Sequence, residues 1–192
     1  LEELNGYHIH AHGAIRPGYS GTAIVSKDEP IKVEYGIPNG NDHNSEGRVI
    51  TATFKDLVVA NTYVPNSGQD LKRLDYRVMW DTALRAYLVK LAAQKLPVIF
   101  TGDLNVAHQP IDIARPKANY NRTAGYTQKE IDGMSALLKY SWWSQRFGMR
   151  AKNVGWRIDY VLVSPGFEKK VKDAFILNEV MGSDHCPVGI EW

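Results

Sequence analysis

The sequence predicts an α+β fold in which strands are stacked in layers and a few helices pack against them. Short β-branched runs bounded by turn residues recur along the chain and indicate strands at 22–26, 48–54, 57–64, 98–101, 157–163 and 187–191. The 192 residues, 44% of them hydrophobic, suit one globular domain over 1–192 with a hydrophobic core. Many strands with few helices favour a layered sandwich.

Two segments predict helices. Between residues 71 and 94 apolar side chains recur three and four positions apart, at Trp80, Leu84, Tyr87, Leu88 and Leu91, and Pro97 follows the pattern. A weaker pattern covers 128–138 after Thr127, whose hydroxyl suits an N-cap. Lys55 and Asp56 separate two strands by a hairpin-length gap, so those strands are predicted to be antiparallel neighbours.

Composition excludes several classes of protein. The net charge of +2 and a pI near 8.6 give too weak a positive field to indicate a polyanionic partner. Cys186 is the single cysteine, which excludes an internal disulfide and favours a reducing compartment, either the cytoplasm or the nucleus of a eukaryote. No apolar run is long enough to span a membrane. A function must therefore be inferred from local residues.

A first polar string, Gly102-Asp103-Leu104-Asn105, follows the apolar run that ends at Phe100. Because side chains alternate along a strand, Asp103 and Asn105 are expected on one side, where they suit a hard cation or a phosphoryl oxygen. Taken alone, Asp-x-Asn after a strand is more often a capped turn.

A second string, 182–187, places Asp184 beside His185 just before the last expected strand. The imidazole suits a hydrogen-bond donor to phosphate, a base or a metal ligand, and the alternative is a surface turn. Asp159 lies among apolar strand residues, where an unpartnered charge would cost roughly 2 to 7 kcal/mol. His185 is therefore its expected partner, which predicts an imidazole oriented by a carboxylate.

Further polar residues also follow expected strands. Tyr63 and Asn66 end the run at 57–64, although a tyrosine there often packs its ring and exposes its hydroxyl. Four polar strings at strand ends are better explained by one shared cleft than by coincidence. His8, His10 and His12 alternate as on one strand face, but no carboxylate stands among them, so exposed strand histidines are expected rather than a metal site.

Several strings together resemble a known family. TYVPN at 62–66, GDLNVAH at 102–108, NVGWRIDY at 153–160 and GSDHCP at 182–187 closely resemble exonuclease III-type apurinic/apyrimidinic endonucleases of the endonuclease/exonuclease/phosphatase superfamily. GYSGTAIVS at 18–26, EGRVI at 46–50 and RLDYR at 73–77 also match. The resemblance implies a two-layered β-sandwich flanked by helices, the deoxyribonuclease-like four-layer fold. It also implies a DNA-repair nuclease that hydrolyses the backbone at abasic sites, with 3′-5′ exonuclease or 3′ phosphodiesterase action.

The resemblance also implies roles for individual residues. Asp103 would act on the attacking water and Asn105 on the transition-state charge, with Tyr63 close by, while Asp159 would hold His185 against the phosphate. The cofactor would be Mg²⁺, or Mn²⁺, bound by Asp103, Asn105, Asp184 and His185. Hydrolysis of a phosphodiester needs a positioned water and neutralised phosphoryl charge, which such a cation supplies.

The expected partner is double-stranded DNA with abasic sites, bound by a monomer. By resemblance the DNA-binding residues are Tyr19, Asn66, Asn119, Trp142, Arg146, Trp156 and Ile158. Trp142, Trp156 and Ile158 would wall a pocket for a flipped-out sugar, and the alternative is that the tryptophans are core residues. A basic group favours phosphate contacts over a solvated face, namely Arg146, Arg150, Lys152 and Arg157. Gln69 stands where some relatives insert an arginine into the duplex.

Two segments that the resemblance implies have no counterpart in this sequence. Relatives begin with two strands that carry an Asn and a metal-binding Glu, whereas residues 1–7 match the stretch after that Glu. About fifteen to twenty residues are also expected between Lys139 and Tyr140, so we expect a break there and an intact mass above 21.6 kDa. The competing hypotheses are a catalytically impaired DNA-binding relative and a phosphatase of the same superfamily.

Overall fold

The computed structural model describes residues 4–38, 40, 43–140, 156–180 and 182–192. In chain order the strands and helices are β1 (His8–His12), β2 (Thr22–Ser26), β3 (Lys32–Tyr35), β4 (Val49–Thr53), β5 (Val58–Tyr63), α1 (Leu74–Ala92), β6 (Val98–Asp103), α2 (Pro116–Asn119), α3 (Gln128–Tyr140), β7 (Asp159–Val163), β8 (Asp173–Ile176) and β9 (Val188–Glu191). Short 3₁₀ turns cover Gln69–Leu71, Pro110–Asp112 and Phe167–Lys170. No described helix is long and apolar enough to cross a membrane.

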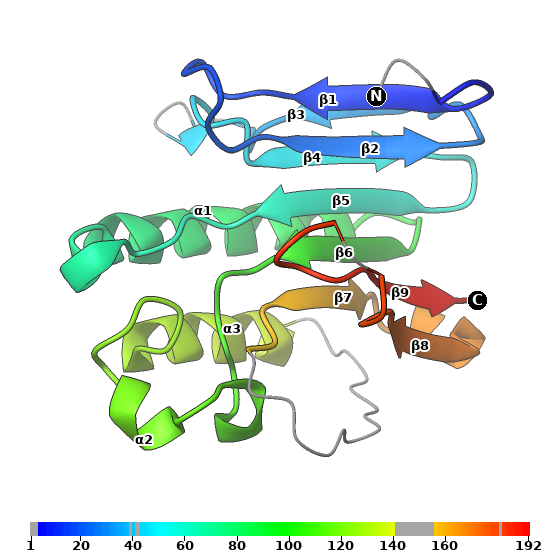
Figure 1. Cartoon of the computed structure of the whole chain (residues 1–192). Coiled ribbons are helices and arrows are strands. Elements are labelled where there is room, and N and C mark those ends of the chain that lie inside the picture. Colours follow the sequence, from blue (N-terminus) through cyan, green and yellow to red (C-terminus); the bar gives the residue numbers. More distant parts are fainter. Residues whose placement is uncertain (1–3, 39, 41–42, 141–155, 181) are drawn as a thin grey trace.

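A five-stranded sheet in the order β3-β4-β5-β6-β7 forms the centre of the molecule (Figure 1). The predicted hairpin is confirmed, since β4 and β5 pair antiparallel across the turn at 54–57. β5 and β6 are parallel because the chain crosses over through α1, whereas β7 returns antiparallel to β6. All six expected strands are present. Strands β3 and β8 were not predicted, because their side chains are half-buried or exposed and give no apolar run.

The two faces of this sheet are covered differently. The largest core cluster joins one face to α1 and α3, through residues such as Trp80, Phe100 and Met134. On the other face, Ile24 of β2 and Ile190 of β9 belong to two separate smaller clusters. The predicted two-layered β-sandwich is therefore confirmed, with a second layer divided between the two-stranded sheets β1–β2 and β8–β9. Among the described residues, the two long helices α1 and α3 cover the other face of the central sheet.

The two predicted helices are confirmed with adjusted ends. α1 buries the predicted apolar stripe against the sheet, and it begins at Leu74 rather than Leu71. Thr127 caps α3 as predicted, since its hydroxyl accepts the backbone N–H of Glu130 and the Glu130 carboxylate accepts the backbone N–H of Thr127. α3 ends at Tyr140, two residues beyond the predicted end at Leu138.

Gly102 lies on β6 one residue before the candidate site, with φ near 127°. A Cβ at this position would stand 1.9 Å from the carbonyl oxygen of Thr62 on β5. Gly102→Ala is therefore expected to lower the free energy of unfolding by more than about 2 kcal/mol, because backbone atoms cannot yield as side chains do. Urea unfolding checks this against Gly13→Ala, where a Cβ meets nothing within 4 Å. Equal stability of the two variants would contradict the close approach.

Candidate active site

Three of the predicted catalytic residues lie in one row across the sheet. Tyr63 on β5 is the register partner of Asp103 on β6, and Asp103 is the partner of Asp159 on β7. β5 and β6 end at this edge while antiparallel β7 begins there, so strands far apart in sequence deliver their side chains to one place. Neighbouring residues in register point to the same side of a sheet. The predicted convergence at strand ends is confirmed for these three residues.

His185 joins this row from the turn before β9. Its Nδ1 lies 2.8 Å from Oδ2 of Asp159, so the predicted contact is present. The hydrogen bond to Asp159 raises the pKa of His185, and the negative charges of Asp159, Asp103 and Asp184 act in the same direction, while burial opposes them. Asp184 itself is exposed and accepts a hydrogen bond from Ser183. The arrangement favours an imidazolium that faces the carboxylate row.

Asp103 is held by the residue two positions after it. The backbone N–H of Asn105 donates to its Oδ1 at 2.8 Å, and the Asn105 side-chain amide donates to its Oδ2 at 3.1 Å. Burial raises the pKa of Asp103, the Asn105 N–H lowers it, and the negative charge of Asp159 raises it again. This carboxylate is therefore a better proton acceptor than an exposed aspartate.

The side chain of Asn105 makes more hydrogen bonds within the protein than the sequence predicts. Its Nδ2 donates to Asp103 and also to the carbonyl of Val64, so both amide hydrogens are used. Its Oδ1 accepts from Nδ2 of Asn66, an exposed residue in the loop after β5. Asn105 also adopts a left-handed φ of 47°, which asparagine tolerates better than most residues. Asn66 is thus the amide of this pair that can reach a ligand directly.

Tyr63 and the predicted DNA contact Tyr19 are joined by one buried arginine. The Arg48 guanidinium lies over the Tyr63 ring at 4.7 Å and donates to the Tyr63 carbonyl at 2.9 Å. It also donates to the Tyr19 hydroxyl at 3.3 Å, and Arg73 donates to the same hydroxyl at 3.0 Å. Tyr19 is therefore fixed next to the row, with two cations at its phenol.

The remaining predicted DNA contacts differ in their exposure to solvent and in their hydrogen-bond partners. Trp156 is 39% exposed and packs near Gly125, so it is not a core residue. Ile158 is half-buried and accepts the N–H of Leu104 through its carbonyl. Asn119 lies on α2, where its amide donates to the carbonyls of Ala114 and Arg115. Trp142 and Arg146 lie outside the described residues.

Arg157 differs from its expected role as a phosphate contact. Its Nε and Nη2 both donate to Oδ1 of the buried Asp112, at 2.9 and 2.7 Å. Its backbone N–H also donates to the Asp112 carbonyl. A buried carboxylate needs a partner, and Arg157 supplies it. The expectation for Arg157 is therefore corrected, while Arg150 and Lys152 lie outside the described residues.

The described residues do not by themselves complete a cation site. No group of three His, Cys, Asp or Glu side chains among them gathers closely enough to hold a metal ion. Asp103 and Asn105 lie together, but Asp159 is engaged with His185 and Asp184 is exposed. His8, His10 and His12 do share β1, yet they are half-buried rather than exposed, and His12 Nδ1 lies 2.9 Å from the Val49 carbonyl oxygen.

Sequence reasoning missed the charged residues that hold the site together. Arg48, Arg77, Asp112 and Glu130 are all buried, and each is bonded to a loop that carries a candidate residue or flanks one. Two signals were available in the sequence. Glu130 stands three residues after Thr127, which is the spacing of a capping box, and Asp81 stands four residues after Arg77 on one helix.

Known proteins share this sequence over most of its length. The exodeoxyribonuclease of Bacillus subtilis is 47% identical over 199 residues, which include 95% of this chain and 78% of that protein. The DNA repair nuclease APEX1 of Danio rerio is 44% identical over 190 residues, which include 90% of this chain and 60% of that protein. The predicted nuclease class is confirmed by these relatives.

Solved structures share the fold. An AP endonuclease from Archaeoglobus fulgidus superposes with a TM-score of 0.80 at 26% identity, over 95% of this chain and 78% of that one. The 3′ phosphatase NExo from Neisseria, bound to a product DNA hairpin, gives 0.81 at 25% identity, over 97% and 80%. The family model described as Endonuclease/Exonuclease/phosphatase matches residues 1–185. The chain therefore belongs to the Endonuclease/Exonuclease/phosphatase family.

Proposed function

We propose that this protein is a metal-dependent DNA-repair nuclease that hydrolyses the phosphodiester backbone at abasic sites, with 3′-5′ exonuclease or 3′ phosphodiesterase action on DNA ends. The observation that carries the proposal is the row in which the half-buried Asp103 is the register partner of Asp159, whose Oδ2 lies 2.8 Å from Nδ1 of His185. The named relatives, an exodeoxyribonuclease and a DNA repair nuclease, support the same chemistry.

The residues divide the work of phosphodiester hydrolysis among them. Asp103, with its raised pKa, accepts the proton of the attacking water. The imidazolium of His185, held by Asp159, donates to a phosphoryl oxygen and offsets its developing charge. Asn66 and Tyr63 stand at the same edge and orient the phosphate through the exposed amide and hydroxyl.

The metal is proposed as Mg²⁺, with Mn²⁺ as a substitute. Asp103 would be a ligand, as an oxygen donor to a hard cation, and Asp184 would assist from the turn before β9. Asn105 would bind the cation only by releasing Asn66 from its Oδ1, and His185 only in its neutral form. The described residues leave this ligand set incomplete. The carboxylate expected in the preceding strands of relatives would complete it. When bound, the metal would neutralise phosphoryl charge.

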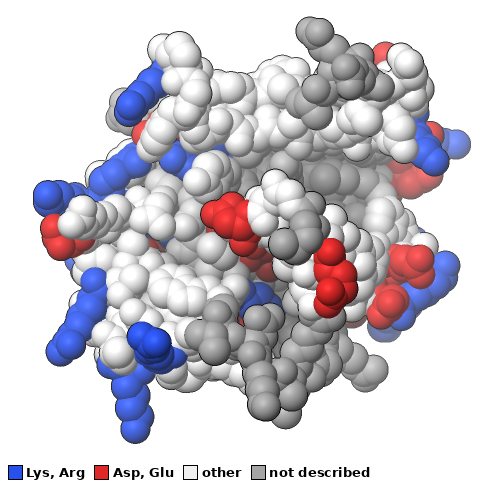
Figure 2. Space-filling view, in the orientation of Figure 1, with Lys and Arg blue, Asp and Glu red and all other residues white. Residues whose placement is uncertain are grey.

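Abasic DNA is proposed as the substrate because a partly exposed indole and basic side chains flank the row. Trp156 offers an apolar wall that accepts a sugar without a base and excludes a full nucleotide by size. Figure 2 shows Lys and Arg side chains gathered on the side of the molecule where α2 and the start of α1 lie, with several acidic side chains nearer the middle. These basic side chains would bind phosphates of the DNA backbone and so position the duplex on the protein, which we propose acts as a monomer.

The test is cleavage of a duplex with one abasic site by the full-length protein, in Mg²⁺ and again in EDTA. The proposal expects a cut at the abasic site with Mg²⁺, none with EDTA, and little action on an intact duplex. Tight binding without cleavage would favour the impaired DNA-binding relative. Release of phosphate from inositol phosphates, with DNA untouched, would favour the phosphatase.

The segment expected between Lys139 and Tyr140 remains a prediction. The alignment with the Bacillus exodeoxyribonuclease runs over 199 residues but takes in 95% of the 192 residues here, so that protein has internal residues without a counterpart in this chain. An intact mass above 21.6 kDa for the isolated protein would support the missing segment. A mass equal to this value would mean that the deletion is real, and weak metal binding and little cleavage would then be expected.

A further inference from the structure

Two oppositely charged side chains lie buried beneath the active-site row. Arg77 of α1 is 2% exposed and Glu130 of α3 is not exposed at all. Their ion pair is long, with Nη1 of Arg77 3.8 Å from Oε1 of Glu130. Burying charges costs several kcal/mol per ion and often stabilises a fold no better than packed apolar residues would. Stability alone therefore does not account for them.

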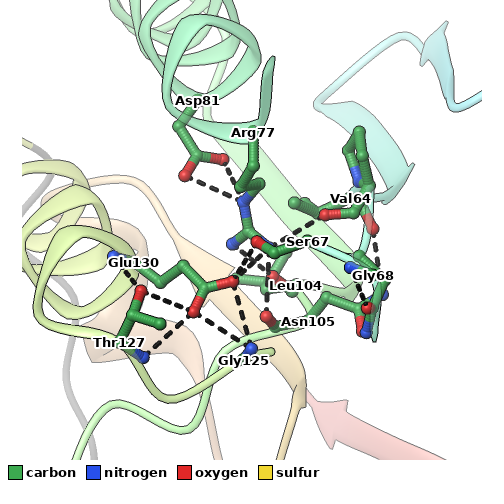
Figure 3. Close-up of polar contacts among 12 residues, drawn as sticks. Val64, Ser67, Gly68, Arg77, Asp81, Leu104, Asn105, Gly125, Thr127 and Glu130 are labelled. Atoms are coloured by element: carbon green, nitrogen blue, oxygen red, sulfur yellow. Dashed lines mark hydrogen bonds and ion pairs between the residues drawn. The ribbon is translucent and has the colours of Figure 1, made fainter. Parts of the chain in front are cut away.

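The guanidinium of Arg77 donates hydrogen bonds to backbone carbonyls of two loops (Figure 3). Nη1 donates to the carbonyls of Pro65 and Asn105, both at 3.0 Å, and Nη2 donates to the carbonyl of Leu104 at 2.9 Å. Nε donates to both carboxylate oxygens of Asp81 one turn along α1, which fixes the guanidinium plane. One side chain thus joins the loop after β5 to the loop after β6.

Glu130 holds the same region from the opposite side. Its Oε1 accepts the Ser67 hydroxyl at 2.5 Å, and Ser67 follows Asn66 in the loop after β5. Its carboxylate also accepts the N–H groups of Gly125 and Thr127, which precede α3. Gly125 lies near Trp156, the proposed wall of the sugar pocket. Glu130 therefore ties the catalytic loop to the proposed pocket.

We propose that Arg77 and Glu130 are positioning residues that set the distance between the two catalytic loops: the loop after β5, which carries Asn66, and the loop after β6, which carries Asn105 next to Asp103 at the strand end. The inference rests on the proposed nuclease function. Asn66 meets Asn105 across these loops at 2.9 Å, so a shift of either loop separates the amides and releases the hold of Asn105 on Asp103. A misplacement of about 1 Å in such a geometry can cost roughly a hundredfold in rate.

The chemistry of the guanidinium explains why arginine is needed. Its planar fork presents five donors in fixed directions, whereas a lysine ammonium is a point charge with three. Arg77→Lys keeps the charge but cannot reach the carbonyls of Pro65, Leu104 and Asn105 together. A role limited to charge balance would be restored by lysine, and a role in fixing loop geometry would not.

The test compares Arg77→Met, Arg77→Lys and Ser67→Ala with Arg85→Met. Arg85 lies two turns further along α1 and lines the groove between α1 and α3. Kinetics on the abasic duplex are measured below each variant's melting temperature, and amide hydrogen exchange is followed in peptides over 62–68 and 102–108. We expect kcat to fall at least about tenfold in both Arg77 variants and severalfold in Ser67→Ala, with KM within about threefold. Exchange should quicken in both loops, and Arg85→Met should match the wild type.

The outcomes separate the two hypotheses. Arg77 variants that keep the kcat and loop protection of Arg85→Met would overturn the positioning role. Full rescue by Arg77→Lys would overturn it as well. If Arg77→Met does not fold, Ser67→Ala and Arg77→Lys decide the matter by the same two measurements. If the wild-type protein does not cleave abasic DNA, the proposed function fails, and hydrogen exchange still decides whether Arg77 holds the loops.

Discussion

Asp103→Asn is expected to lower kcat on an abasic duplex by roughly a thousandfold, within the range that a lost general base and its electrostatic neighbours account for. The substitution keeps the shape of the side chain and the hydrogen bond from the Asn105 backbone N–H, although it loses the acceptor of the Asn105 side-chain amide. An amide cannot accept the proton of the attacking water. KM should change little, because Asp103 sits inside the site and not on the DNA-binding surface. Single-turnover cleavage at saturating Mg²⁺ measures the effect.

The matched control is Asp75→Asn on α1, whose side chain is 90% exposed and paired with an exposed lysine. It should cleave like the wild type. The raised pKa of Asp103 also sets a direction for the pH profile, since this carboxyl takes up its proton at higher pH than an exposed aspartate does. kcat/KM should therefore decline already above the usual aspartate range as the pH falls. Unchanged turnover in Asp103→Asn would remove this residue from the mechanism.

Asp159→Asn is expected to lower kcat by about a hundredfold and to leave DNA affinity nearly unchanged. The hydrogen bond from His185 to Asp159 raises the pKa of the imidazole, so the charged form persists to higher pH than it would alone. An asparagine stabilises the imidazolium less, and the pKa of His185 should fall. NMR titration of the His185 ring in metal-free buffer, together with steady-state kinetics, checks both parts.

The same contact affects stability in a defined direction. Because the folded pKa of His185 is raised, its contribution to stability is fully present below the unfolded pKa and is lost as the pH rises through the folded pKa. Asp159→Asn should flatten this dependence, and Asp173→Asn, at an exposed position of β8, should not.

Arg146→Ala, chosen from the sequence as a DNA contact, provides the contrast to Asp159→Asn: it should weaken DNA binding and its salt dependence more than turnover. Equal effects of Asp159→Asn and Arg146→Ala on both parameters would refute this division of roles.

The local signals of the sequence predicted six of the strands, the two long helices and the proposed members of the catalytic row. Alternation and β-branched runs identify the strands that end at Tyr63 and Asp103, because a strand buried on both faces has a strong apolar pattern. A lone carboxylate in the apolar run of β7 demanded a partner, and this cost alone predicted the contact between Asp159 and His185. β3 and β8 were not predicted because edge strands with half-buried or exposed side chains lack such a pattern.

The tertiary structure decided the register and the buried charges. Register is set by pairing between residues far apart in the sequence. The spacing of Tyr63, Asp103 and Asp159 along the chain therefore could not show that they form one row. The sequence by itself was enough to propose which groups carry the chemistry, since residue type and local burial pattern are written in it. The positions of Arg77 and Glu130 depend on loops brought together only by folding, and their bonds go largely to backbone carbonyls and N–H groups, which every residue has. A donor that binds backbone atoms leaves no mark on the sequence of its partner.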